Sequence, residues 1–394
     1  MVKLNSIELF AGAGGLALGL HDAGFKPKAI VEFNKDACQT LRANQVFDYG
    51  LGLYEGDVSA FDYLSILDDI ELISGGPPCQ PFSLGGKAKG HHDSRDMFPE
   101  AVRAIREIKP RAFIFENVKG LLRKNFFQYF EYIILQLQYP SIVKNDDEVW
   151  EAHRARLEKY HTQCNHAELE YKVVYRLVNA ANYGIPQKRE RVFIVGFRSD
   201  IDANWTFPNP THSEEALFWD KWVTKEYWSR HRLACPVIDE STSRQVESIK
   251  QKFGMFNPAL KPWVTVRDVL SDLPDPLSKE AGNYNHHVFK DGAKVYPGHT
   301  GSYIDEPSKA LKAGGHGVPG GENMVRFEDG SVRYFTVRES ARIQTFPDDF
   351  AFQGSWGEVM RQLGNAVPAE LAKAVGESVF RVLKKKHNVA FMEY

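Results

Sequence analysis

An abrupt end to a short apolar strand constrains the fold of this chain more than any other feature of its sequence. Residues 71–74 read as a buried strand, and the run Gly75–Ser83 (GGPPCQPFS) follows directly. Two glycines and two prolines end regular structure there, so Cys79 is expected on a stiffened loop at the carboxyl end of a strand. Open α/β sheets bind their ligands at that edge. The sequence therefore predicts an α/β sheet with a functional site beside Cys79.

The surroundings of Cys79 favour a nucleophilic thiol. A free cysteine has a pKa of about 8.5, which neighbouring groups can lower, and the thiolate is the reactive form. The alternative is a small buried hydrophobic residue, as most lone cysteines are. A core cysteine normally lies within a helix or strand, whereas Cys79 stands between Pro-Pro and Gln-Pro-Phe. These neighbours argue for the nucleophile.

The composition is that of a soluble globular protein. Its 394 residues suggest two or three domain-sized units, and 43% hydrophobic with 25% charged residues allow a substantial core. No apolar run approaches the length of a membrane span, and the first residues resemble no secretory signal. The net charge of −2 means that any DNA-binding surface must be a local patch.

Four scattered cysteines predict a reducing compartment rather than a disulfide framework. They are Cys38, Cys79, Cys164 and Cys235. His161, Cys164 and His166 are close enough in sequence to suggest zinc, but no second ligand pair follows at zinc-finger spacing. We therefore expect no metal.

A glycine-rich turn follows the first predicted strand, at residues 6–10. The run Ala11–Leu16 leads into a helix that ends near Ala23. Glycines there let a ligand approach the backbone, and the helix N-terminus offers unpaired N–H groups. An NAD-binding turn would read G-x-G-x-x-G, but Ala17 stands at the last glycine and Gly14 and Gly15 are adjacent. The spacing argues against a nicotinamide cofactor.

Two carboxylates end predicted strands at the same sheet edge. Glu32 follows the strand at residues 29–31, where a carboxylate about 20 residues after the turn can accept hydrogen bonds from ribose hydroxyls. Glu116 follows the strand at residues 111–115. A carboxylate that leaves an apolar strand tends to have a raised pKa and can act as a general acid. Capping of the next helix is the alternative for both.

A basic loop lies between two strands that are predicted to pair, residues 171–179 and 191–197. It carries Gln187, Arg189 and Arg191. Arginine forks can bind a base carbonyl and a backbone phosphate together. An exposed charged hairpin is the alternative, and spacing alone favours it.

Three other stretches lack a strong structural pattern. Residues 85–92 are glycine-rich and basic, which fits a flap that closes over DNA or a plain surface linker. Residues 140–169 read as a polar surface insertion. From residue 199 to 325 periodicity weakens and strong helix patterns are few, while Trp, His, Pro and Gly become frequent.

Six runs resemble, in order, the motifs of the DNA (cytosine-5) methyltransferase family. They are F-x-G-x-G-G at 10–15, P-P-C-Q-x-F-S at 77–83, E-N-V at 116–118, Q-x-R-x-R at 187–191, a helix motif at 337–347 and G-N-x-V-P at 364–368. Together they cover both ends of the chain, and chance agreement of all six is negligible.

The resemblance implies a Rossmann-like α/β sheet that binds S-adenosylmethionine (SAM), with helices on both faces, and a smaller irregular target-recognition domain. It implies residues 1–200 for the catalytic domain, with the insertion at about 140–170, residues 201–325 for target recognition and 326–394 for the return to the catalytic domain. The implied enzyme moves the SAM methyl group to C5 of a flipped-out cytosine in a specific duplex DNA sequence, and releases S-adenosylhomocysteine.

The resemblance also implies roles for individual residues. Cys79 is the covalent nucleophile, Glu116 the acid, and Arg189 or Arg191 the cation beside the base. The implied SAM-binding residues come from the turn, the strand ends and the C-terminal segment: Phe10, Gly12, Gly14, Gly15, Leu16, Glu32, Asp57, Val58, Pro77, Asn365, Ala366 and Val367.

Double-stranded DNA is the implied partner, and a cognate restriction endonuclease could share the site without stable binding. We expect a monomer in the bacterial cytoplasm, associated with the nucleoid through DNA and without membrane contact. Two alternatives stay open. An RNA (tRNA) cytosine methyltransferase of the same superfamily would share the motifs. A non-catalytic DNA-binding relative is opposed by the intact Cys79, Glu116 and Arg191.

Overall fold

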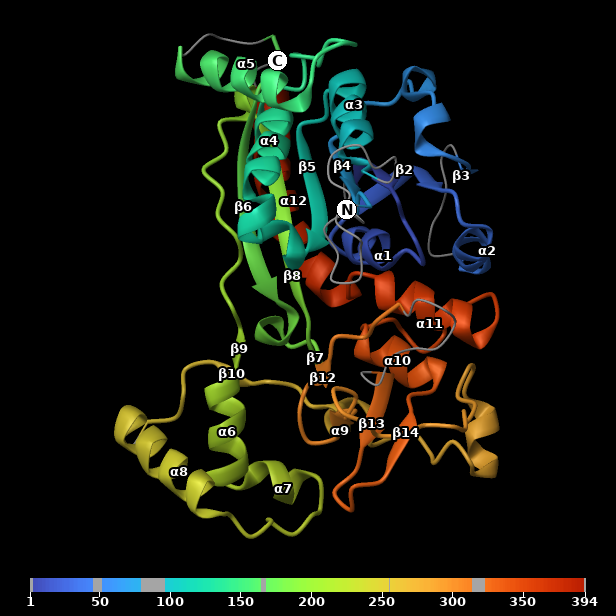
Figure 1. Cartoon of the computed structure of the whole chain (residues 1–394), viewed down its shortest axis with the longest axis vertical. Helices are drawn as coiled ribbons and strands as arrows, with labels where there is room; N and C mark the ends of the chain where they lie inside the picture. Colours follow the sequence, from blue (N-terminus) through green and yellow to red (C-terminus); the bar gives the residue numbers. More distant parts are fainter. Residues whose placement is uncertain are drawn as a thin grey trace.

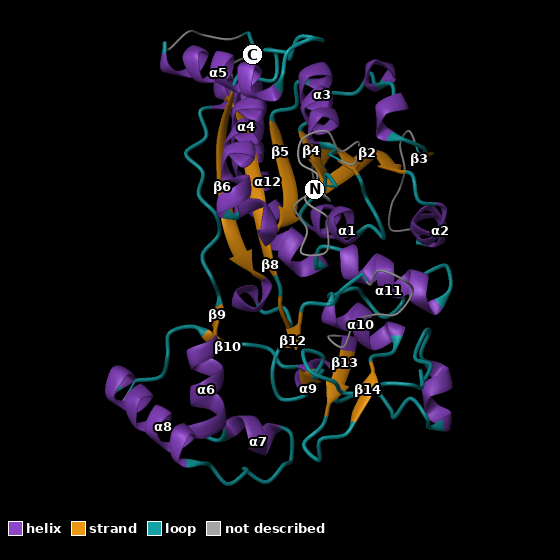
Figure 2. Ribbon diagram, viewed as in Figure 1, coloured by secondary structure: helices purple, strands orange, loops and turns teal. Residues whose placement is uncertain are grey.

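The computed structural model describes residues 3–44, 52–78, 96–163, 168–254, 256–313 and 323–392, with side chains of the last helix through residue 385. Cys79, the flap at 85–92, Cys164 and His166 therefore lie outside the described residues. A seven-stranded sheet forms the upper part of the molecule, with helices packed on it, and a smaller part lies below (Figures 1 and 2).

The central sheet has the strand order β3-β2-β1-β4-β5-β8-β6. β1 to β5 are parallel, whereas β8 is antiparallel to both of its neighbours, β5 and β6. The predicted pairing of the strands on either side of the basic loop is thus confirmed. The strands are β1 (Leu4–Leu9), β2 (Phe25–Glu32), β3 (Leu53–Glu55), β4 (Leu72–Gly75), β5 (Ala112–Val118), β6 (Tyr171–Asn179) and β8 (Glu190–Arg198).

Apolar helix faces cover both sides of the sheet, which confirms the predicted fold class. One core joins the sheet to α3 (Phe98–Ile108) and α4 (Phe127–Gln138), and α5 (Trp150–Thr162), within the predicted insertion, also contributes to it. A second core joins the opposite face to α1 (Gly15–Asp22) and α12 (Ala369–Met392). The last helix of the chain therefore packs beside the first.

The strand order reverses between β1 and β4, which are neighbours in the middle of the sheet. Connections from these two strands leave in opposite directions, and sheets of this kind bind ligands in a crevice at the carboxyl ends of such strands. Phe10 follows β1 directly, and residues 76–78, the described start of the Pro-Pro-Cys loop, follow β4. The fold thus brings the two most distinctive sequence features to one place.

The lower part contains more helix than the sequence suggested. Strong helix patterns are few between residues 199 and 325, yet helices form there, because α6, α8 and α9 begin at side-chain caps from Ser213, Asp239 and Thr265. Val246 alone is buried on α8, so its apolar periodicity is weak. The elements are β9 (His212–Ser213), α6 (Glu214–Trp222), α7 (Glu226–Arg230), α8 (Glu240–Phe253), β10 (Lys261–Pro262), α9 (Val266–Leu270), β11 (Ser302–Tyr303) and β12 (Ser308–Lys309).

The chain returns to the upper part through a hairpin and three helices. β13 (Met324–Arg326) pairs with β14 (Val332–Tyr334), so residue 325 falls inside a hairpin. Val325 shares a core cluster with Phe335. α10 (Val337–Ile343) and α11 (Trp356–Asn365) then lead to α12. Among the described residues, no helix is both long and apolar enough to cross a membrane.

Candidate active site

The glycine turn after β1 adopts a backbone that explains its residues. Phe10, Gly12 and Gly14 have φ angles of 56°, 55° and 85°, in the left-handed region. The Gly12 N–H donates to Glu32 Oε2 at 2.7 Å, and the Asn34 N–H donates to Oε1 at 2.8 Å. Glu32 thus holds the turn from the end of β2, and its two oxygens keep further lone pairs for a ligand.

The C-terminal segment packs directly on this turn. A Cβ atom at Gly15 would lie 2.3 Å from the Val367 carbonyl oxygen, so only glycine fits there. Leu16 and Val367 belong to the same core cluster, and Ala366 is also buried, whereas Asn365 is exposed at the end of α11. The structure therefore brings residues 350 positions apart into one wall.

The end of β3 completes this side of the site. The Gly56 N–H donates to the Glu32 carbonyl at 3.0 Å, which places Asp57 close to Glu32. Asp57 is exposed, Val58 is buried, and hydrogen bonds from Ser59 hold the pKa of the Asp57 carboxyl below its usual value. Phe33, next to Glu32, is 72% exposed. The sequence analysis missed Phe33, although an aromatic residue directly after a strand-ending carboxylate could have marked it.

The first residues of the Pro-Pro-Cys loop are fixed against β5. Asn117 Nδ2 donates to the Pro77 carbonyl at 2.9 Å, and the Met97 N–H donates to the Pro78 carbonyl at 3.1 Å. A Cβ atom on Gly76 would lie 3.5 Å from Glu116 Oε2. The described part of the loop, which ends one residue before Cys79, therefore lies beside the Glu116 carboxylate.

Glu116 forms a buried ion pair with Arg191. The Arg191 Nε lies 2.7 Å from Glu116 Oε1, across the antiparallel pair of β5 and β8. Burial raises the pKa of the Glu116 carboxyl, and the charges of Arg191 and then Arg189 oppose that rise. The result is a carboxyl that is shielded from water and held in a fixed direction.

Arg189 makes different contacts from Arg191. Its guanidinium is fully buried and donates to the carbonyls of Leu311 at 3.0 Å and Gly364 at 2.8 Å. The structure therefore places Arg191, and not Arg189, in contact with Glu116. Arg189 instead ties the loop before β8 to two distant segments.

Two buried glutamines extend this tether, and the sequence analysis gave neither a role in the site. Gln187 accepts from the Leu311 N–H at 3.0 Å and donates to Gln344 Oε1 at 3.1 Å. Gln344 in turn donates to the Ala366 carbonyl at 3.2 Å. The Gln187–Arg191 loop thus connects the Glu116 carboxylate, the segment around Leu311, and the wall that contains Asn365.

The chain as a whole matches the family model described as C-5 cytosine-specific DNA methylase, over residues 4–139 and 152–381. The chain belongs to this family. The interval that the family model leaves out, residues 140–151, falls within the predicted insertion. The protein is thus a DNA (cytosine-5) methyltransferase, and the reaction predicted from the six motifs is confirmed at this level.

Individual relatives of this methyltransferase agree. It is 34% identical to the type II methyltransferase M.PspPI of Psychrobacter sp. (strain TA137), over 96% of this chain and 79% of that protein. It is 32% identical to the type II methyltransferase M.NgoMIV of Neisseria gonorrhoeae, over 98% of this chain and all of that protein. The enzyme is therefore of the type found in restriction-modification systems.

Solved structures share the fold of this methyltransferase. A DNA modification methyltransferase encoded within an Escherichia coli prophage superposes with a TM-score of 0.59 at 20% identity, covering 97% of this chain and all of that one. The S. pombe Dnmt2 methyltransferase superposes with a TM-score of 0.53 at 16% identity, covering 97% and 99%. The fold and the family both indicate dependence on SAM.

The methyltransferase also buries a carboxyl group that the sequence analysis did not single out. Glu8, the last residue but one of β1, accepts a hydrogen bond from the hydroxyl of Ser74, which stands opposite it in β4. Burial raises the pKa of Glu8 to about 8, and the Ser74 bond opposes that rise. Glu8 is thus a neutral acid at neutral pH.

Of the three residues considered for zinc, His161 alone lies among the described residues of the methyltransferase. His161 lies in α5 and hydrogen bonds through Nδ1 to the Tyr139 hydroxyl, at 2.6 Å. Across the ranges that the structure describes, no group of three or more His, Cys, Asp or Glu side chains could hold a metal ion.

Proposed function

We propose that the enzyme methylates C5 of a flipped-out cytosine in a specific duplex sequence through a covalent bond between Cys79 Sγ and C6. Cytosine C5 is a weak nucleophile, and addition of the thiolate to C6 makes it enamine-like. After methyl transfer, loss of the C5 proton and expulsion of Cys79 restore the aromatic ring. The observation that carries the proposal is the buried Glu116–Arg191 pair beside the start of the Cys79 loop.

Glu116 supplies the proton that this addition requires. Thiolate attack at C6 pushes electron density toward N3 of the base, so an acid at N3 lowers the barrier. The raised pKa of Glu116 keeps a proton available, and Arg191 fixes the direction of the carboxyl. Arg191 also offers N–H donors for the cytosine O2. Arg189 has a supporting role, since its two terminal nitrogens donate to the carbonyls of Leu311 and Gly364.

The described residues of the crevice fit SAM. The ribose hydroxyls of an adenosine need hydrogen-bond acceptors, and its adenine ring needs a flat apolar surface. Glu32 offers the acceptors, and the exposed Phe33 offers the surface. The left-handed turn leaves room for close approach of a ligand to the backbone. When bound, SAM supplies an electrophilic methyl on sulfonium. The binding residues are Phe10, Gly12, Gly14, Gly15, Leu16, Glu32, Phe33, Asp57, Val58, Pro77, Asn365, Ala366 and Val367.

The remaining parts of the proposal concern DNA and setting. The target atom is hidden in the duplex, so the base must flip out, which costs a few kcal/mol. Residues 201–325 form the target-recognition domain, residues 1–200 and 326–394 the catalytic domain. The enzyme acts as a monomer in the bacterial cytoplasm, without a metal, releases S-adenosylhomocysteine, and shares its site with a restriction endonuclease.

Bisulfite sequencing tests the proposal. The chain is expressed in a bacterial host that lacks cytosine methylation, and genomic DNA is sequenced beside total tRNA from the same cells. We expect complete methylation of one cytosine in one short sequence, and none with Cys79→Ala. Methylation of tRNA alone, or of neither nucleic acid, would contradict the proposal.

A further inference from the structure

A short, well-anchored turn follows the Glu116 strand. We call residues 119–127 the cationic turn. It contains two single-turn 3-10 helices, at Lys119–Leu122 and Lys124–Phe126. Leu121 is fully buried in the core, and the backbone is closed by bonds from Arg123 N to the Gly120 carbonyl (3.2 Å) and from Phe126 N to the Arg123 carbonyl (2.8 Å). The backbone is therefore fixed, while Arg123 and Lys124 are exposed.

The cationic turn carries two cations that have no carboxylate partner among the described residues. Its nine residues include Lys119, Arg123 and Lys124 and no carboxylate. Lys119 pairs with Glu190 at 2.7 Å, but in the ranges described neither Arg123 nor Lys124 has a carboxylate partner. Many other surface cations are paired, as Arg154 is with Glu131 and Glu158. On a chain of net charge −2, two uncompensated cations on a rigid turn form a local positive field.

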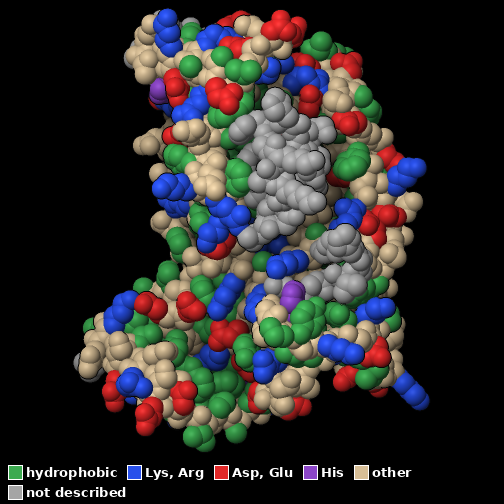
Figure 3. Space-filling model, viewed as in Figure 1, with side chains coloured by type: hydrophobic (Ala, Val, Ile, Leu, Met, Phe, Trp, Pro, Cys, Tyr) green, Lys and Arg blue, Asp and Glu red, His purple; other side chains and the backbone are tan. Residues whose placement is uncertain are grey.

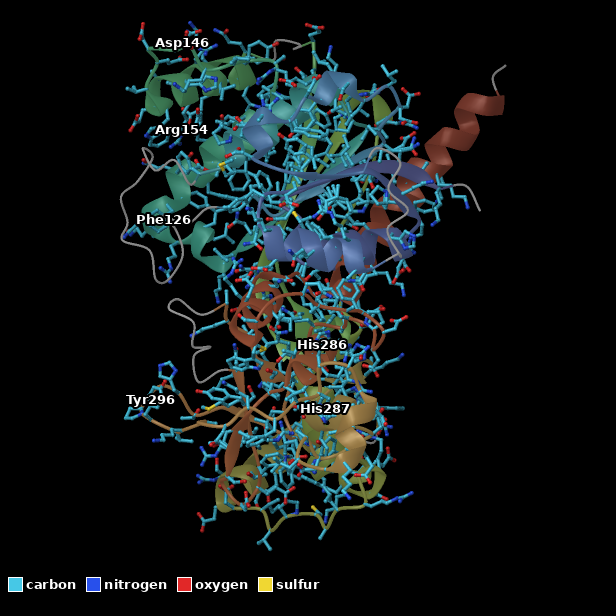
Figure 4. All side chains as sticks on the ribbon, turned by 90° about the vertical axis from the view of Figure 1, so that its right-hand side faces the viewer. Phe126, Asp146, Arg154, His286, His287 and Tyr296 are labelled. Atoms are coloured by element: carbon cyan, nitrogen blue, oxygen red, sulfur yellow. The ribbon has the colours of Figure 1, made fainter. Side chains whose placement is uncertain are left out.

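The cationic turn lies next to the reaction site. It begins three residues after Glu116, and Val118 stands opposite Arg191 in the ladder. The 3-10 helix at Lys119–Leu122 follows β5 directly, so the turn continues the strand that carries Glu116. Phe126, within the turn, and Tyr296, in the lower part, project on the same side of the molecule (Figure 4). On this face, Lys and Arg side chains gather between the sheet and the lower part (Figure 3).

We propose that the cationic turn binds backbone phosphates of the duplex beside the flipped cytosine, with Arg123 and Lys124 as the contacting cations. This inference rests on the proposed function. Phosphate contacts fix the position of a protein on DNA without reading its sequence. In the proposed function, residues 201–325 read the sequence, so the catalytic domain needs contacts that only position the duplex. Arg123 and Lys124 have no carboxylate partner among the described residues, and the turn contains no Asp or Glu. Such a surface favours a polyanion as the bound molecule.

The salt dependence of DNA binding tests this inference. We compare the wild type with Arg123→Ala/Lys124→Ala on sheared genomic DNA that lacks cytosine methylation. Each phosphate contact contributes about −0.9 to the slope of log affinity against log salt, so the variant's slope should be shallower by about 1.8. Between roughly 50 and 200 mM salt, wild-type affinity should fall about 12-fold more than that of the variant. Arg123→Lys/Lys124→Arg should restore the wild-type slope.

A matched control separates phosphate contact from net charge. Lys384→Ala/Lys385→Ala removes the same charge from exposed positions near the end of α12, the red helix that runs away from the face with Phe126 and Tyr296 (Figure 4). Its slope should equal that of the wild type. An unchanged slope for Arg123→Ala/Lys124→Ala, or an equal change in the control, would overturn the inference.

Two further readouts keep the result interpretable. SAM-induced thermal stabilisation should be the same in all variants, since neither pair lines the crevice. Should the double variant lose it, each single variant is measured, with a slope change of about 0.9 expected. If the wild type methylates DNA but its salt-dependence slope equals that of Arg123→Ala/Lys124→Ala, the phosphate-binding role of the turn is wrong and the proposed function stands. If the wild type methylates no DNA, the proposed function itself fails.

Discussion

Glu116 Oε1 and Arg191 Nε lie 2.7 Å apart on neighbouring antiparallel strands, although the two residues are 75 positions apart in sequence. Side chains on two antiparallel strands meet across the ladder at fixed positions. The register of β5 and β8 therefore brings Glu116 and Arg191 together. Asn117, next to Glu116, holds the Pro77 carbonyl. The strand that carries Glu116 therefore also anchors the start of the Pro-Pro-Cys loop.

The first prediction concerns this acid. Glu116→Gln keeps the size and hydrogen bonding of the side chain but removes the proton that the reaction needs. We expect methyl transfer to fall by about 10²–10⁴, the usual contribution of a general acid. The measurement is incorporation of labelled methyl groups into DNA at saturating SAM. Turnover near that of the wild type, in a folded variant, would assign Glu116 to structure alone.

The second prediction concerns Glu8 and pH. Its pKa is raised to about 8 in the folded protein from 4.5 in the unfolded chain, so the folded state binds one more proton between these values. Stability from this group is present below about pH 4.5 and is lost as the pH rises through 8, by about 1.4 kcal/mol per pH unit. Relative to Glu8→Gln, wild-type unfolding free energy should therefore fall from pH 5 to 8 and level off above. Parallel curves from denaturant unfolding would show that Glu8 is ionised in the fold.

The third prediction concerns the SAM crevice. A ligand that binds only the folded state raises its stability, by about 2.7 kcal/mol at a hundredfold excess over Kd. Glu32→Ala and Asn365→Ala should lower the melting-temperature gain from SAM, and NAD should give none to any form. Glu55→Ala is the matched control, because Glu55 stands opposite Glu32 in the β2–β3 register and pairs with Arg42. Equal gains in all three variants would place the pocket elsewhere.

The fourth prediction concerns sequence recognition. Residues 201–325 contain no catalytic or SAM motif, and each bidentate contact to a base edge gives about 1–3 kcal/mol of discrimination. Exchange of this segment for that of a relative with another target should transfer the methylated sequence, as bisulfite sequencing would show. The donor must keep apolar residues at 311 and 325, which pack on Phe335. An active chimera that still methylates the original sequence would remove the segment as the reader.

Much of the fold could be predicted because it follows from local pattern. The strand ends at Glu32 and Gly75 are marked by apolar runs that stop at a polar residue or a glycine. The predicted end of the next strand at residue 115 was wrong, because β5 continues through Glu116 to Val118, where the ladder with β8 still pairs its backbone. Parallel strands bring their carboxyl ends to one edge of the sheet, so the predicted strand ends also predicted the place of the ligand-binding crevice. The helices of the lower part were missed because caps such as Asp239 start them without a strong apolar stripe.

Contacts between distant residues explain the parts of the site that the sequence could not give. Arg189 and Arg191 are two positions apart and equally basic, yet one binds the carbonyls of Leu311 and Gly364 and the other binds Glu116. Side chains two positions apart fall on the same face of an extended chain, so the sequence pattern predicts the same environment for both arginines. Only their distant contacts distinguish them. The burial of Glu8 likewise depends on Ser74 of a neighbouring strand. Only the assembled sheet reveals either relationship.

Covalent capture by Cys79 tests the central claim most directly. DNA synthesised with 5-fluorocytosine in place of cytosine is incubated with SAM and the enzyme, because fluorine cannot leave C5 as a cation and the adduct is trapped. The wild type should form a DNA adduct that resists denaturation, as should Cys235→Ala, which removes a free thiol of the lower part. Cys79→Ala should form none. An equally abundant adduct with Cys79→Ala would contradict the account.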